Sequence, residues 1–188
     1  MKYLFVFAGL LLFLTTCNSP TSAPLPADLS EFEVEAIPGS NIQKVSKLYE
    51  DGTTLEVGQL LNGQKFGAWV TYHPGKPYPQ KLISYVDGLA NGPYFEFNNR
   101  GQMEVKAFYK NNQLHGPWGT YRFGRAEKEA NYKDGKLDGF YREYDTANGN
   151  IKKEIGYKDG EMHGKYIYFD DDGNVNLEYT YQNGKKVE

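Results

Sequence analysis

The feature that most constrains the fold of this chain is a motif that returns about every 24 residues. A glycine recurs at steps of 25, 24, 23 and 25 residues, at Gly67, Gly92, Gly116, Gly139 and Gly164. Another glycine stands four positions earlier in each unit, except in the third unit, where Asn112 replaces it. A chain with such a period folds as a row of identical small units, each of which buries its apolar side against its neighbours.

Two aromatic positions repeat with the same period. One aromatic residue follows the second glycine of each unit by two positions, and another follows it by five. The first aromatic column is Trp69, Tyr94, Trp118, Tyr141 and Tyr166. The second aromatic column is Tyr72, Phe97, Tyr121, Tyr144 and Phe169. These rings supply the apolar area that a chain with 16 Tyr and 11 Phe needs for a core.

Each unit has the signals of a β-hairpin. Asn-Gly and Asp-Gly pairs, such as Asn62-Gly63 and Asp134-Gly135, are typical of two-residue hairpin turns. Apolar and polar residues alternate from Val175 to Tyr181, as in a strand, and no helical period stands out between residues 41 and 188. The sequence therefore predicts an all-β fold, in which antiparallel hairpin repeats stack into an elongated sheet or solenoid. Residues 47–60 have the pattern of half a unit, which predicts a cap at the N-terminal end.

The spacing of the two aromatic columns leaves two arrangements open. Positions three apart in a regular strand lie on opposite faces of a sheet. Either both faces carry a row of aromatic side chains, or a bulge follows the second glycine. All ten aromatic residues are candidates for a binding surface, because an exposed aromatic row is typical of such surfaces.

The repeat resembles a known family. The pattern G-x-x-x-G-x-W/Y-x-x-Y/F, followed by a turn glycine and a closing tyrosine, is similar to the MORN repeat over residues 47–188. It is more similar to the bacterial variant found in lipoproteins and in a YwqK-type family labelled as antitoxins. The resemblance implies a MORN-type repeat sheet and does not imply an activity, since one fold serves many functions.

The N-terminus predicts export. Lys2 precedes an apolar run from Leu4 to Leu14, which is typical of a secretory signal peptide over residues 1–16. Residues 14–17 (LTTC) resemble a lipobox, which implies cleavage before Cys17 and lipidation of that residue; the alternative is a plain signal peptide with an incidental cysteine. Asn18 implies the outer membrane, and we expect the periplasmic face, with the cell surface as the alternative.

The remaining residues divide into a tether and the repeat domain. Residues 17–43 begin with proline and small polar residues and predict a flexible tether. The alternating stretch EFEVE, residues 31–35, is compatible with a lone strand, but we favour a linker. Residues 44–188 are expected to form the repeat domain, with about five full repeats and partial repeats at both ends.

The sequence contains no convincing catalytic, cofactor or metal site. His115 and His163 occupy equivalent positions two units apart, which is about 19 Å at the usual strand spacing and too far for one metal ion. No nucleophile elbow, phosphate-binding loop or dinucleotide motif is present. We therefore expect no enzyme activity, no metal and no cofactor, with a scattered acidic active site as a minor alternative.

These features predict a non-catalytic scaffold. A net charge of −3 argues against nucleic acid, which binding proteins meet with a basic patch. We expect a repeat protein that is attached to the membrane through Cys17 and binds another envelope protein or peptide. The main alternative is a glycan- or peptidoglycan-binding lipoprotein that uses its aromatic rows, and phospholipid recognition is a weaker one. The partner, the oligomeric state and the exposed aromatic column stay open.

Overall fold

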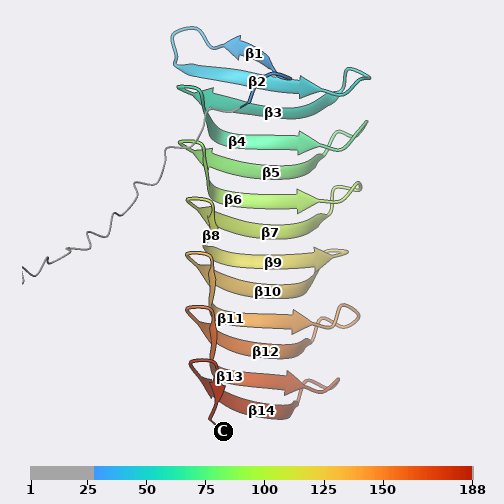
Figure 1. Cartoon of the computed structure of the whole chain (residues 1–188). Coiled ribbons are helices and arrows are strands. Elements are labelled where there is room, and N and C mark those ends of the chain that lie inside the picture. The colour runs from blue at the N-terminus through green and yellow to red at the C-terminus, as the bar shows by residue number, and fades with distance from the viewer. Residues whose placement is uncertain (1–27, 188) are drawn as a thin grey trace, which may run out of the picture.

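The computed structural model describes residues 28–187 and contains one antiparallel sheet of 15 strands (Figure 1). Strands pair in the order in which they follow along the chain, and only the two-residue strand β8 lies off this path, paired with β7. The prediction of an all-β fold of stacked antiparallel hairpins is confirmed. The strands are β1 Glu33–Ala36, β2 Ile42–Leu48, β3 Thr54–Leu61, β4 Gln64–Tyr72, β5 Pro79–Val86, β6 Leu89–Phe97, β7 Met103–Lys110, β8 Gln113–Leu114, β9 Gly116–Arg122, β10 Arg125–Lys133, β11 Lys136–Tyr144, β12 Ile151–Lys158, β13 Glu161–Phe169, β14 Val175–Gln182 and β15 Lys185–Lys186.

Two-residue turns join the strands at one edge of the sheet. Asn62 and Gly63 have φ angles of 52° and 77°, and Asp134 and Gly135 have 47° and 81°. Two successive positive φ angles define the turn type whose twist matches that of paired strands. Asparagine, aspartate and glycine adopt this conformation at the lowest cost, which explains why these pairs recur.

A bulge follows each turn, at the second glycine of the unit. In the last unit Ile155 pairs with Tyr166 and Tyr157 pairs with Met162, so that residues 163–165 oppose the single residue Gly156. The φ angles of the second glycines lie between 65° and 111°. The bulge bends the end of each hairpin out of the sheet.

The bent turns stack on one another. The backbone N–H of Gly88 donates to the carbonyl of Lys65 at 2.9 Å, and the N–H of Gly160 donates to the carbonyl of Leu137 at 2.8 Å. In the same way, the N–H of Asn112 donates to Ala90, that of Gly135 to Leu114, and that of Gly184 to Met162. These bonds build a second column of backbone along one edge of the sheet (Figure 1).

The two aromatic columns lie on opposite faces of the sheet. Tyr141 shares a face with Glu143, to which its hydroxyl donates, whereas Tyr144 shares the other face with Arg142. Both arrangements that the sequence left open are therefore present together: a bulge at the glycine and an aromatic row on each face. We call the face with the first aromatic column the turn-covered face and the face with the second aromatic column the open face.

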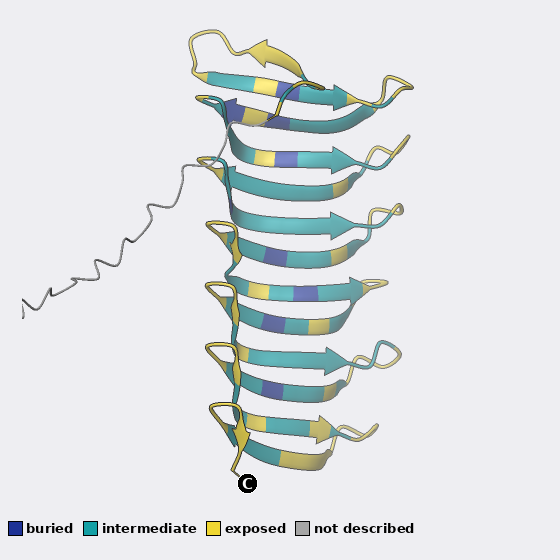
Figure 2. Ribbon diagram, in the orientation of Figure 1, coloured by how far each residue is buried: buried dark blue, intermediate teal, exposed yellow. Residues whose placement is uncertain are grey.

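Complete burial is concentrated at the N-terminal end, where Val45, Leu60 and Trp69 form the largest buried cluster (Figure 2). The indole of Trp69 lies directly on Gly58, where an added Cβ would be 2.2 Å from the ring, and its Nε1 donates to the carbonyl of Gln59 at 3.1 Å. Farther along, the buried apolar residues are small or branched and lie one to a strand, at Ala90, Ala107, Ala130 and Ile155. The molecule thus has a continuous thin core with a thicker N-terminal end.

The segment before β2 belongs to the folded domain, which differs from the expected flexible linker. Strand β1 pairs with β2, with Val34 opposite Val45. Leu29 and Phe32 pack against the buried cluster, and the Phe32 ring lies edge-on to Trp69 with centroids 5.9 Å apart. Burial of these side chains stabilises the segment, because the large ring of Trp69 would otherwise face water. The expected signal peptide and Cys17 lie outside the described residues.

Candidate binding surfaces

The first aromatic column forms the core of the turn-covered face. Each of its rings lies edge-on or tilted against the closing tyrosine of its unit, as in the pair Tyr94–Tyr109 with centroids 5.6 Å apart. Trp69 is only 1% exposed, and the Nζ atom of Lys65, in the bent turn, lies 3.9 Å above its ring. The other rings of the column are half-buried. This column therefore offers no freely exposed aromatic row.

Burial also governs the ionisation of these phenols. It raises the pKa of Tyr94 and of Tyr141 well above the ordinary value, and hydrogen bonds to Glu96 and Glu143 raise it further. Burial also raises the pKa of Tyr85 and Tyr132. Tyr94 and Tyr141 are therefore neutral donors to these carboxylates at physiological pH.

The second aromatic column lies on the open face. Within residues 28–187, extensive contacts between strands join only strands that are neighbours in the sheet, so no second layer packs on this face. The five rings of the column are half-buried, none of them fully exposed. The ten predicted aromatic residues therefore do not form one surface. The structure divides them between the two faces of the sheet.

An apolar strip crosses the N-terminal half of the open face. Val57 pairs with Val70, Val70 with Leu82, and Leu82 with Phe95 across successive strands. Phe97 of the second aromatic column lies beside Phe95, with ring centroids 6.3 Å apart. The repeat pattern does not single out these four residues, Val57, Val70, Leu82 and Phe95, because their positions vary from unit to unit and only the strand register aligns them.

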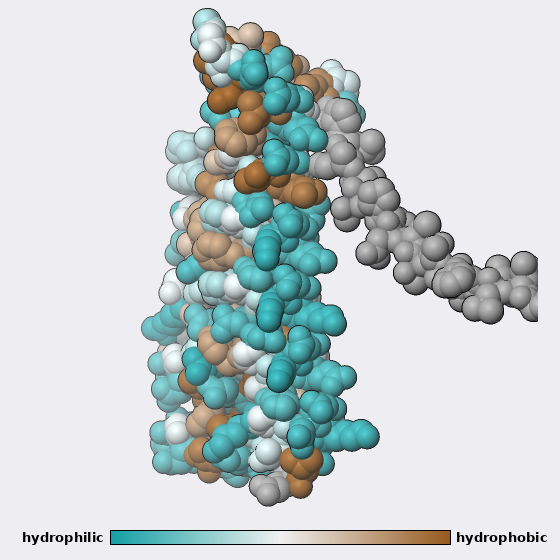
Figure 3. Space-filling model, turned by 90° about the vertical axis from the view of Figure 1, so that its left-hand side faces the viewer, coloured by the Kyte–Doolittle hydropathy of each residue, from teal (hydrophilic) through white to brown (hydrophobic). Residues whose placement is uncertain are grey.

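A cavity of about 590 Å³ adjoins the apolar strip. It is lined by Val57 and Tyr72 together with Gly75, Lys76 and Pro77 of the loop after β4. Figure 3, which faces the column of turns, shows hydrophobic residues gathered towards the N-terminal end and hydrophilic residues along the turns. The four residues of the apolar strip all lie in the N-terminal half of the sheet.

The same row continues as a charged row in the C-terminal half. Glu129 pairs with Arg142 and Arg142 with Glu154 across the strands. The Nε atom of Arg142 lies 2.6 Å from a carboxylate oxygen of Glu154, and the Tyr144 hydroxyl donates to Glu129 at 2.7 Å. Burial, followed by the bond to Glu129, raises the pKa of Tyr144 to about 12. We call Glu129, Arg142 and Glu154 the charged row.

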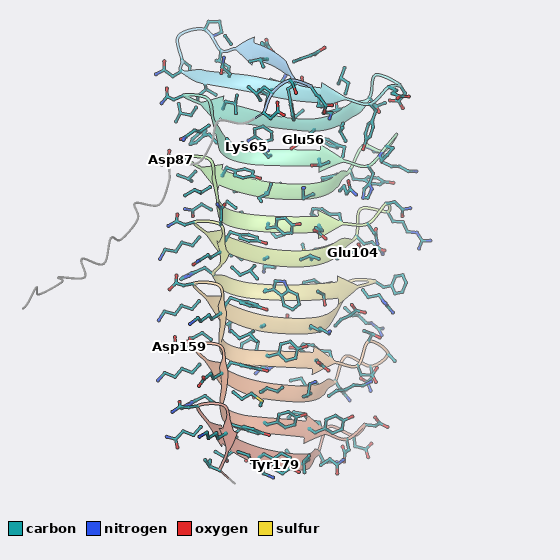
Figure 4. All side chains as sticks on the ribbon, viewed as in Figure 1. Glu56, Lys65, Asp87, Glu104, Asp159 and Tyr179 are labelled. Atoms are coloured by element: carbon teal, nitrogen blue, oxygen red, sulfur yellow. The ribbon has the colours of Figure 1, made fainter. Side chains whose placement is uncertain are left out.

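A second cavity, of about 510 Å³, lies at the opposite edge of the sheet from the turns. Its lining includes Tyr94 of the first column and Phe97 of the second, together with Lys81, Glu96 and Glu104. Figure 4 labels Glu104 near this end of β7. Polar side chains from neighbouring strands and loops therefore converge on a half-apolar hollow.

The described part of the chain brings no three histidine, cysteine or acidic side chains together in a group that fits a metal ion. The two histidines of equivalent position differ in surroundings: His115 Nδ1 lies 3.2 Å from Asp134, and His163 Nδ1 is buried without a hydrogen-bond partner. Within residues 28–187 there is also no helix long and apolar enough to cross a membrane.

Comparison with known proteins does not assign this chain to a family. No protein-family model matches the sequence, and no curated protein matches it either.

Proposed function

We propose that this chain is a lipid-anchored, non-catalytic MORN-type repeat scaffold of the bacterial cell envelope, which binds an extended segment of another envelope protein. Attachment through Cys17 and a place at the outer membrane rest on the N-terminal sequence. The repeat pattern and the sheet of stacked hairpins support the scaffold.

The apolar strip on the open face is the observation that carries this proposal. Val57, Val70, Leu82 and Phe95 are half-buried, and Val57 also lines the cavity of about 590 Å³. Protein interfaces commonly consist of an apolar centre with charged and polar surroundings. The charged row, which continues the strip, would then set the register of the partner rather than supply most of the affinity.

A protein partner fits this geometry better than a polysaccharide does. Sugar rings stack on flat, exposed aromatic rings, whereas Trp69 is buried and the other nine rings of the two aromatic columns are half-buried. The apolar strip consists mainly of aliphatic side chains, which suit the side chains of a peptide.

Photo-crosslinking in cells of the source organism tests the proposal. A photoreactive amino acid at Leu82 of the full chain should yield an adduct with one protein. Leu82→Glu, combined with the photoreactive residue at Val70, should reduce that adduct about tenfold or more, as loss of a central interface contact does. Because Glu154 occupies the equivalent position in the fourth unit, we expect the sheet to accept this substitution.

The matched control is a photoreactive residue at Glu154, which lies on the same face in the charged row. We expect a weaker adduct there. Adducts that contain only cell-wall glycan would refute the proposal, and so would a protein adduct that Leu82→Glu leaves unchanged.

A further inference from the structure

The cavity of about 510 Å³ has a counterpart elsewhere in the chain that indicates what it binds. Glu96 in the second unit and Glu143 in the fourth stand four residues after their second glycines. Each accepts a hydrogen bond from the tyrosine two residues earlier, Tyr94 and Tyr141. The two carboxylates therefore occupy the same place and hold the same first partner.

The fourth unit fills this place with a lysine. Lys153 lies opposite Glu143 in the sheet, and its Nζ atom is 2.8 Å from the carboxylate oxygen that also accepts the Tyr141 bond. One residue earlier, Lys152 lies 3.0 Å from Asp145. Two ammonium groups of the chain itself thus compensate the acidic side chains at this end of the unit.

The second unit lacks both lysines. Val105 lies opposite Glu96, where the fourth unit has Lys153, and Glu104 replaces Lys152. Glu96 and Glu104 form no ion pair in the described structure, and both line the cavity. The second unit therefore has a cavity lined by carboxylates at the position where the fourth unit holds the ammonium group of Lys153.

Lys81 does not remove this need for a cation. It pairs with Glu96 across the strands, on the far side from Val105. Lys128 has the equivalent position relative to Glu143 and does not prevent Lys153 from binding there. Two cations are therefore compatible with one carboxylate in this arrangement, and the second unit supplies only one of them.

We propose that this cavity binds the ammonium group of a lysine side chain, with the ammonium at Glu96 and Glu104 and the alkyl chain along the ring of Tyr94. Aromatic rings and carboxylates together suit a cation on an apolar stem. The inference depends on the proposed function only in assigning the lysine to a protein partner.

Titration of the isotopically labelled full chain in detergent with Nα-acetyl-lysine amide tests the site by nuclear magnetic resonance. We expect saturable shifts of the backbone amides of Tyr94, Phe97 and Asn99. Glu96→Gln should weaken binding about tenfold or more, because a charge-assisted bond is lost. Val105→Lys should abolish binding, because it supplies the missing ammonium from within the chain.

Glu143→Gln is the matched control: it makes the same change at the occupied site and should leave binding unaltered. Equal binding of the Nε-acetylated amide would refute recognition of an ammonium group. Tighter binding of glucosamine than of the lysine amide would refute a lysine ligand and indicate an amino sugar instead. Absence of saturable shifts would refute the site. Because crosslinking at Leu82 probes the opposite face, the proposed scaffold function and the lysine site can fail independently.

Discussion

Trp69 is buried because its neighbour on the adjacent strand has no side chain. A Cβ atom at Gly58 would lie 2.2 Å from the indole, which is far inside normal contact distance. Other units place a larger residue at the equivalent position of the preceding strand, such as Ala130 opposite Tyr141. The first unit therefore uses glycine to make room for an indole that lies flat on the strand.

We expect Gly58→Ala to lower the free energy of unfolding by about 1–3 kcal/mol, the usual effect of overpacking. In a strand without such a neighbour, the same change would be neutral or stabilising. Chemical denaturation measures the effect. Trp69→Tyr, which copies Tyr94, should reduce the penalty in the double variant, and a purely additive double variant would contradict the steric explanation.

Phe123 has a backbone conformation that is unfavourable for its residue type. Its φ angle is 50°, and it is the only residue other than Asn, Asp or Gly with a positive φ among residues 28–187. Its side chain is 70% exposed, so that packing does not compensate the strain. Nothing in the fold requires an aromatic residue at this turn.

Phe123→Asn should raise the free energy of unfolding by about 1 kcal/mol, because asparagine tolerates the left-handed conformation that phenylalanine does not. The midpoint of denaturation reports this change. Phe123→Leu keeps the strained backbone and should leave the midpoint nearly unchanged. A lower midpoint for the asparagine variant would show that the ring stabilises the fold.

The bent hairpin is the element from which the molecule is built, and its second glycine determines the bend. Gly139 has a φ of 111°, and an added Cβ would be 3.2 Å from the Cβ of Asn131. Gly164 has a φ of 87° and open space around it. Gly164 is therefore required only by its backbone conformation, whereas Gly139 is required both by its backbone conformation and by the nearby side chain of Asn131.

Gly164→Ala should lower the free energy of unfolding by about 1–2 kcal/mol from backbone strain alone. Gly139→Ala should lower it more, because Asn131 must also move. Thermal denaturation of both variants measures the difference. Asn131→Gly is the control: it removes the contact and should bring the Gly139 variant to the level of the Gly164 variant.

The hairpin could be predicted from the sequence, whereas the open face could not. Glycine pairs and aromatic columns recur because backbone angles and ring packing repeat in every unit. The apolar strip and the charged row occupy positions that vary, such as Leu82 and Glu154, and only the register aligns them. Strand β1 was expected to be a linker, because its pairing with β2 and the packing of Phe32 on Trp69 are tertiary contacts that local composition does not reveal.

Across the whole molecule, half-buried tyrosines make stability depend on alkaline pH. Burial raises the pKa of tyrosines in four of the five aromatic units, and the value for Tyr144 is about 12 against an ordinary 10.0. Above pH 10 the unfolded chain loses phenolic protons that the folded chain retains. The stabilisation is therefore complete below about pH 10 and declines as the pH rises through the folded pKa values.

We expect the denaturation midpoint to fall between neutral pH and about pH 11, in step with the appearance of tyrosinate absorbance. Tyr94→Phe removes one titrating group and should make the decline shallower. Tyr168→Phe, at an exposed tyrosine, is the control for the loss of a phenolic hydroxyl. A midpoint that does not vary with pH would contradict this account.

Because the strands of residues 28–187 pair in the order in which they follow along the chain, apart from the two-residue β8, the molecule can be completed while it is still being made. A hairpin that emerges from a ribosome or a translocation channel finds its whole packing surface already in place on the preceding unit. The N-terminal segment with Leu29 and Phe32 would close over its cluster first, and later units would add to it one at a time. At every stage the last strand to fold would expose apolar side chains, as β14 does in the finished molecule, where Val175 and Leu177 are 53% and 40% exposed.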